Sequence, residues 1–141
     1  SLAPLHAQVT AALEGFVLRA IAGKLDGPEL ARVRQNLDQQ EAAVGRRDIR
    51  ECVRLDADFH MMFCEFLGNQ EIIRVMQQQR EKIHRAATRV FRQEPGRYAS
   101  SLGEHTAIAA AVESGHADTA ARILGEHLEY GKQFLLSPRR R

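Results

Sequence analysis

The spacing of apolar residues constrains the fold of this chain more than any other feature of its sequence. Apolar residues recur three and four positions apart, alanine and leucine are frequent, and no segment alternates β-branched with polar residues. This pattern predicts α-helices and no β-strands. Glycine and proline divide the chain into segments that are each long enough for a helix. The predicted helices cover about residues 4–23, 28–45, 48–67, 69–91, 98–114 and 116–136.

The junctions between these segments carry local signals for helix ends. Pro28 suits a first helical turn, and Asp48 and Asn69 are predicted N-caps. Gly68 is the predicted C-terminal stop of the third helix. Connections this short favour antiparallel neighbours, so we predict an all-α fold, an antiparallel helical bundle.

The composition is that of one globular domain. The chain has 141 residues, of which 44% are hydrophobic and 27% are charged, so it can bury a sizeable core. The formal net charge of +2 includes the three arginines of residues 139–141, so the rest of the chain has no excess of positive charge that would indicate nucleic-acid binding. We expect residues 1–136 to form the domain and residues 137–141 to be a disordered basic tail.

The sequence carries no signal for a membrane or an oxidising compartment. Its longest uninterrupted apolar run, 107–112, is far shorter than a membrane span, and residues 1–10 lack the pattern of a secretory signal. Cys52 and Cys64 form no CxxC motif, so we expect two small core residues, not a disulfide scaffold or a thiolate zinc site. We therefore expect a cytoplasmic protein with no membrane partner.

Ionisable side chains occupy positions that the helical pattern assigns to the interior. Asp56 and His60 lie one turn apart on a face of the third predicted helix that is otherwise apolar. His105 and His127 fall on the apolar stripes of the fifth and sixth predicted helices. Burying an unpaired charge costs roughly several kcal/mol, so four inward groups are best explained by one shared partner.

A divalent cation is the simplest shared partner. Imidazole and carboxylate suit zinc first, with nickel, manganese, cobalt or iron as alternatives, whereas calcium or magnesium would want more oxygen ligands. The competing interpretation of any single histidine is a core imidazole bonded to a carbonyl. That interpretation, or simple surface exposure, is assigned to His6, His84 and His116. The predicted metal ligands are Asp56, His60, His105 and His127.

Two glutamates next to predicted ligands raise the question of an enzyme. Glu104 precedes His105 and Glu126 precedes His127, as if a glutamate base stood beside a metal. Adjacent helical residues diverge by about 100°, so neither glutamate shares a face with its own histidine. No nucleophile elbow, HExxH motif or phosphate-binding glycine loop occurs. We expect no enzyme; a metal-dependent enzyme and a bundle with a purely structural metal stay open as alternatives.

Arg80 interrupts an apolar seam on the fourth predicted helix, between Met76 and Ile83. It either extends its charge into solvent at the edge of the helix or clamps an anion in the same cavity as the metal. The other arginines of this helix have no interleaved aromatic residues, so they indicate a solvated basic edge and no DNA-binding surface.

Several stretches of the sequence resemble one known family, the FCD effector domain of GntR-type bacterial transcription regulators of the FadR subfamily. The resemblance covers essentially the whole chain, and the combination of motifs in this order is fairly specific. It is carried by Leu13-Glu14, by DADFH at 56–60, by LGN at 67–69, by EHTAI at 104–108, and by His127.

The resemblance implies a bundle of six to seven helices around a central cavity that holds a divalent metal and a small organic acid. It assigns the metal to the same four residues as the helical stripes do. It also implies a homodimer, with a winged helix-turn-helix domain, absent from this chain, that precedes it and binds operator DNA. The chain would then be a ligand-sensing and dimerisation domain that reaches DNA only through that other domain.

One position departs from the family pattern. The family often places an arginine four residues before the glutamate of the first helix, where it can meet the carboxylate of the effector. Thr10 stands at that position in this chain. We therefore expect effector contacts at Thr10 and Arg80, or a less acidic effector.

Overall fold

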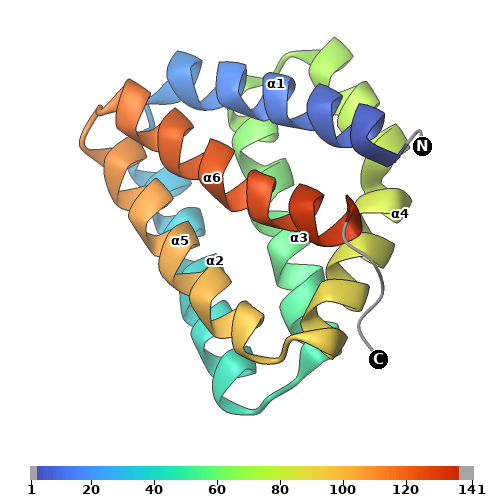
Figure 1. Ribbon diagram of the computed structural model, residues 1–141. Helices are drawn as coiled ribbons and strands as arrows, with labels where there is room; N and C mark the ends of the chain where they lie inside the picture. Colours follow the sequence, from blue (N-terminus) through green and yellow to red (C-terminus); the bar gives the residue numbers. More distant parts are fainter. Residues whose placement is uncertain (1–2, 137–141) are drawn as a thin grey trace.

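The computed structural model describes residues 3–136, and the predicted tail at 137–141 lies outside the described residues. The described part is all-α without a strand, which confirms the predicted fold class, and each helix boundary lies within two residues of its predicted place. None of these helices combines the length and apolar character needed to cross a bilayer. The helices are α1 (Ala3–Ile21), α2 (Gly27–Gly45), α3 (Ile49–Leu67), α4 (Gln70–Gln93), α5 (Gly96–Glu113) and α6 (Ala117–Leu136) (Figure 1).

Polar caps explain where α2, α3 and α4 begin. The carboxylate of Asp26 accepts a hydrogen bond from the backbone N–H of Glu29 (2.8 Å), and the Glu29 carboxylate accepts one from the backbone N–H of Asp26 (3.0 Å). This reciprocal pair is a capping box. The Asp48 carboxylate accepts from the backbone N–H of Glu51 (3.1 Å), and the Asn69 side chain caps α4 in the same way. Asp48 and Asn69 are thus confirmed as N-caps.

Two glycines bring the turn after α1 against the turn after α5. Gly23 and Gly115 both have a backbone φ of 76°, a left-handed conformation that side chains with a Cβ rarely adopt. A Cβ on Gly23 would lie 3.1 Å from the Cα of Gly115, so the two turns touch backbone to backbone. The N–H of Gly23 donates to the carbonyl of Val112 at 2.8 Å. This contact fixes α1 relative to the α5–α6 hairpin.

Helix α3 runs through the middle of the bundle and packs against α1, α2, α4 and α5. Helix α6 packs against both α1 and α5, and Figure 1 shows it between them. Phe59 of α3, Ile108 of α5 and Leu124 of α6 are buried in the main core. A second buried cluster includes Val53 of α3 and Phe91 of α4. Inward-pointing side chains of α3, α5 and α6 therefore meet near the axis of the bundle.

Candidate metal centre

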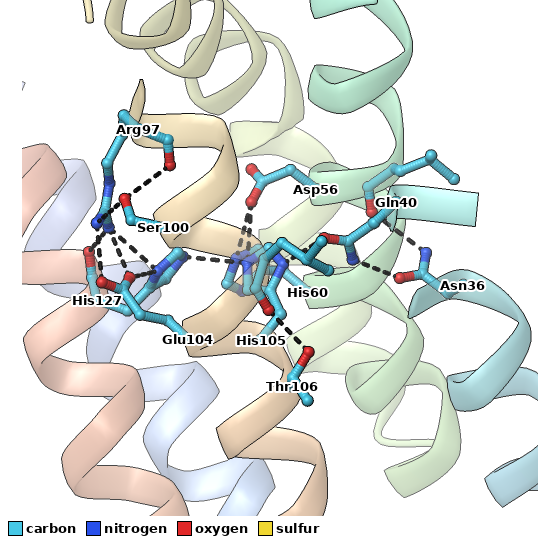
Figure 2. Close-up of polar contacts among 12 residues, drawn as sticks. Asn36, Gln40, Asp56, His60, Arg97, Ser100, Glu104, His105, Thr106 and His127 are labelled. Carbon is cyan, nitrogen blue, oxygen red and sulfur yellow. Dashed lines mark hydrogen bonds and ion pairs between the residues drawn. The ribbon is translucent and has the colours of Figure 1, made fainter. Parts of the chain in front are cut away.

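The predicted ligand residues come together in the interior. Asp56 and His60 project from α3, His105 from α5 and His127 from α6 (Figure 2), and all four are buried. Each offers one ligand atom, and these atoms all lie within 4.8 Å of one another. Side chains that are up to 71 positions apart in the sequence, from Asp56 to His127, therefore converge on one point.

The facing atoms are the Nε2 nitrogens of the histidines and a carboxylate oxygen. The distance from Asp56 Oδ1 to His105 Nε2 is 3.2 Å, and that from Asp56 Oδ1 to His60 Nε2 is 3.4 Å. The Nε2 atoms of His105 and His127 are 3.3 Å apart. The donors thus surround a common position and present it with three nitrogens and one oxygen.

The opposite nitrogen of each ring, Nδ1, is held by another side chain. The distances are 2.5 Å from His60 to the Glu14 carboxylate, 2.8 Å from His105 to the amide oxygen of Gln40, and 2.5 Å from His127 to the Glu104 carboxylate. An acceptor at Nδ1 favours the ring form in which Nδ1 carries the proton and Nε2 keeps its lone pair, which is the form that binds a metal.

A chain of amides fixes the orientation of Gln40. The Nε2 group of Gln40 donates to Asn36 Oδ1 at 2.6 Å, and the amide nitrogen of Asn36 donates to the carbonyl of Leu55 at 3.3 Å. Because the Asn36 amide is anchored in this way, its oxygen faces Gln40. The Gln40 oxygen then faces His105, so the Nδ1 of His105 must donate.

Arg97 supports the third histidine from the first turn of α5. Its two terminal nitrogens donate to the two carboxylate oxygens of Glu104 at 2.8 and 2.7 Å. The guanidinium lies 3.9 Å from the centre of the Tyr130 ring, a cation–π contact that links α5 to α6. Arg97 is itself buried, so its charge is balanced by Glu104 and not by solvent.

Burial and neighbouring charges shift the titration of the cluster. Burial alone would raise the pKa of Asp56, but the imidazoles of His60 and His105 hold it well below its usual range. Burial would lower the pKa of His60, yet the carboxylates of Glu14 and Asp56 raise it well above its ordinary value. Burial lowers the pKa of His105 to about 4. Two of the ligand groups, the Asp56 carboxylate and the His105 imidazole, are therefore in their metal-binding form at neutral pH.

The donor set fits a divalent transition metal. With both Nδ1 protons committed to Gln40 and Glu104, the lone pairs of His105 Nε2 and His127 Nε2 face each other across 3.3 Å. Two facing lone pairs repel unless a proton or a cation lies between them. Three imidazoles and one carboxylate suit zinc and its neighbours in the first transition row, and supply too few oxygens for calcium or magnesium.

A cavity of about 140 Å³ lies next to this cluster. Asp56, His60 and His127 form part of its wall, together with Ala7, Thr10 and Glu14 of α1. An apolar part of the wall comes from α4 and α6. That part consists of Ile83, Ala86, Ala87, Val90, Phe91 and Leu128.

The two predicted effector contacts have different surroundings. Thr10 lines the cavity, is buried, and donates its hydroxyl hydrogen to the carbonyl of Ala7 at 3.1 Å. Arg80 is absent from the residues described as lining this cavity. Its side chain is 44% exposed and forms an ion pair with Asp58 at 3.2 Å. The geometry of Arg80 therefore corresponds to the alternative in which its charge extends into solvent.

Sequence reasoning missed most of the residues that hold the outer ring nitrogens. Gln40 was not singled out, and Glu14 entered only as part of the family resemblance. Helical geometry predicts that Glu104 does not share a face with His105. The structure shows that Glu104 instead contacts His127 on the next helix. The signal for Arg97 was its place two helical turns before Glu104, at a spacing that puts both on one face of α5.

A comparison with protein families matches the FCD domain over residues 7–130, which is most of the chain. A comparison with curated proteins gives no match. The matched region includes all six helices, at least in part, and the four converging ligand residues. The chain therefore belongs to the FCD domain family, the effector-binding domains of GntR-type transcription regulators.

Proposed function

We propose that this chain is the metal-dependent sensing and dimerisation domain of a GntR-type transcription regulator in the cytoplasm. Asp56, His60, His105 and His127 would bind a divalent transition metal, zinc before nickel, manganese, cobalt or iron. A small organic acid would bind in the adjacent cavity. The observation that carries the proposal is the convergence of three Nε2 atoms, each ring held at Nδ1, on a point at the wall of that cavity.

The cavity supports a sensing role because five helices contribute to its wall. Thr10 lies on α1, His60 on α3, Phe91 on α4, Ser101 on α5 and Leu128 on α6. Four protein donors leave positions at a five- or six-coordinate ion for an oxygen of the acid. An acid that contacts these helices favours the packing in which they close around it. In the homodimer, that change of packing would alter the spacing of DNA-binding domains that precede α1.

The outer contacts of the cluster favour a sensor over a hydrolase. Glu14 and Glu104 are the carboxylates beside the predicted ligands, and each is already bonded to the Nδ1 of a histidine. A carboxylate engaged in this way orients the imidazole and is poorly placed to take a proton from a substrate. The sensing proposal therefore assigns these groups to orientation.

Metal content tests the ligand assignment. We expect elemental analysis of the purified chain to find about one divalent ion per chain, and a loss of that ion in His60→Ala, His105→Ala and His127→Ala. His116→Ala is the matched control, because His116 is exposed and lies outside the cluster. Full metal content in all three cluster variants would contradict the proposal.

Acid binding separates a sensor from a structural metal site. We expect calorimetric titration of the zinc-loaded chain with acetate, succinate, gluconate and benzoate to give saturable binding of at least one acid. The same titration after chelation of the metal is expected to give none. An absence of binding for every acid, or binding that does not depend on zinc, would show that the metal only joins helices.

A further inference from the structure

We propose that the cavity selects a small monocarboxylate with an apolar body, such as a short branched-chain or aromatic acid. This inference rests on the proposed function and narrows the chemical class of its ligand. It follows from the two unlike parts of the cavity wall, from the Ser101 hydroxyl at that wall, and from the ion pair of Arg97, the arginine that lines it.

The halves of the cavity differ in chemistry. One end carries Asp56, His60 and His127, which can hold a metal and so attract a carboxylate. The wall from α4 offers only aliphatic and aromatic groups, among them Val90 and Phe91, which are each 5% exposed. A ligand whose apolar body covers this wall gains hydrophobic stabilisation, whereas a polar body gains none.

The hydroxyl of Ser101 suits the carboxylate of the ligand. Ser101 is 3% exposed as a residue and lines the cavity. In the part of the chain that the structure describes, no hydrogen bond is recorded for its hydroxyl. A carboxylate oxygen bound in the cavity would accept its hydrogen.

The wall has no cation available for a second carboxylate. Arg97 is the one lysine or arginine among the described residues that line the cavity, and its two terminal nitrogens are bound to Glu104. Glu14 lies on the same cavity wall and would repel a second negative charge. The far end of a dicarboxylate would therefore be buried against apolar groups without compensation, which is unfavourable.

The volume of the cavity limits the size of the apolar body. It measures about 140 Å³, and an apolar cavity of about 150 Å³ admits a molecule the size of benzene. Benzoate and isovalerate therefore match both the size and the chemistry of the site. A sugar acid such as gluconate would bring hydroxyl groups against the apolar wall from α4, which offers them no side-chain hydrogen-bond partner.

Relative affinities on the zinc-loaded chain test this inference. We expect calorimetric titration to show benzoate and isovalerate binding at least about tenfold more tightly than acetate, succinate and gluconate. Tighter or equal binding of succinate or gluconate would overturn the inference and leave the sensing function standing. If no acid binds, or if binding is independent of zinc, both fail.

A change at the apolar wall locates the ligand. Ala87→Leu places a larger side chain in the cavity, and we expect it to weaken benzoate binding at least about tenfold while acetate changes by less than about twofold. Ala42→Leu is the matched control, because Ala42 is exposed on α2 away from the cavity, and it should leave both affinities unchanged. Circular dichroism confirms that both variants fold. Unchanged benzoate binding in Ala87→Leu would overturn the assignment to this cavity.

Discussion

Each imidazole of the cluster is held at Nδ1 by another side chain, so its orientation does not depend on the metal alone. Glu14, Gln40 and Glu104 occupy the Nδ1 positions of three different histidines, and they come from α1, α2 and α5. Two of these acceptors are carboxylates and one is a neutral amide. Two of the three rest in turn on a further side chain, Gln40 on Asn36 and Glu104 on Arg97. The affinity of the site should therefore be sensitive to residues that never touch the ion.

Replacing Gln40 tests this sensitivity. Gln40→Leu removes the acceptor at His105 Nδ1, so the ring no longer has a fixed proton position, and we expect zinc affinity to fall about 10- to 100-fold. Competition with a chromogenic chelator measures the change. Gln39→Leu is the control, because Gln39 is exposed and next in sequence. Equal zinc affinity in wild type and Gln40→Leu would mean that the amide chain has no role in the site.

The two cysteines give a second test at the scale of single residues. Burial raises the pKa of Cys64 to about 12, and burial also raises the pKa of Cys52. Because the reactive species is the thiolate, a raised pKa lowers reactivity at any pH below it. At pH 8 the thiolate fraction of Cys64 is about 1,000-fold below that of an ordinary thiol. We expect a disulfide reagent such as DTNB to label both thiols only after unfolding; rapid labelling of the native chain would contradict their burial.

At the scale of the elements, α3 carries two ligands, and the helices around it supply the other ligands and most of their supports. Its central position follows from a face that is apolar except for Asp56 and His60, so those two are carried inward with Phe59 and Phe63. Helix α5 presents His105 to the same point, and the glycine contact at its end holds α1 in place. The geometry of the site therefore depends on turns far from it.

Gly23→Ala tests the contact between the two turns. A Cβ at a φ of 76° is strained and would lie 3.1 Å from the Cα of Gly115, so we expect a loss of about 1–2 kcal/mol in the free energy of unfolding. Urea denaturation followed by circular dichroism measures it. Gly125 is exposed on α6, and a Cβ there would meet no atom within 4 Å, so the control Gly125→Ala should be neutral or slightly stabilising. A neutral result for Gly23→Ala would contradict the close approach.

At the scale of the whole molecule, the cluster joins α3 to α5 and α6, which α4 separates from it in the chain. An ion bound by α3, α5 and α6 is a cross-link that exists only in the folded state, because the unfolded chain does not bring these ligands together. The cavity beside it extends this coupling to α1 and α4. Under the proposed function, metal binding, acid binding and folding would be linked equilibria.

The pH dependence of metal-linked stability tests this coupling. At a metal concentration about 1,000 times the dissociation constant, the folded state gains about 4 kcal/mol. Protons compete with the ion for His60, whose pKa the neighbouring carboxylates raise well above its ordinary value, so the gain should grow as the pH rises from 5 to 8. Thermal denaturation with and without zinc, at each pH, measures the gain. A zinc-induced shift that is equal at pH 8 and pH 5 would contradict coordination by histidine.

The helices and their ends could be predicted from the sequence because their causes are local. The spacing of apolar residues, the caps at Asp48 and Asn69 and the stop at Gly68 act within a few residues of the chain. The same periodicity pointed Asp56, His60, His105 and His127 inward, because a residue that shares a helical face with buried neighbours is buried with them.

Only the tertiary structure decided which partners these inward groups meet. The bonds from Glu14 to His60, from Gln40 to His105 and from Glu104 to His127 each join two helices, and no spacing within one helix predicts them. The same holds for Arg80. Its position in the apolar seam is compatible with an anion clamp or with a charge that extends into solvent, and the packing of the helices places it beside Asp58 at the surface. Sequence sets which face of each helix turns inward, while the distances between faces follow from how whole helices pack.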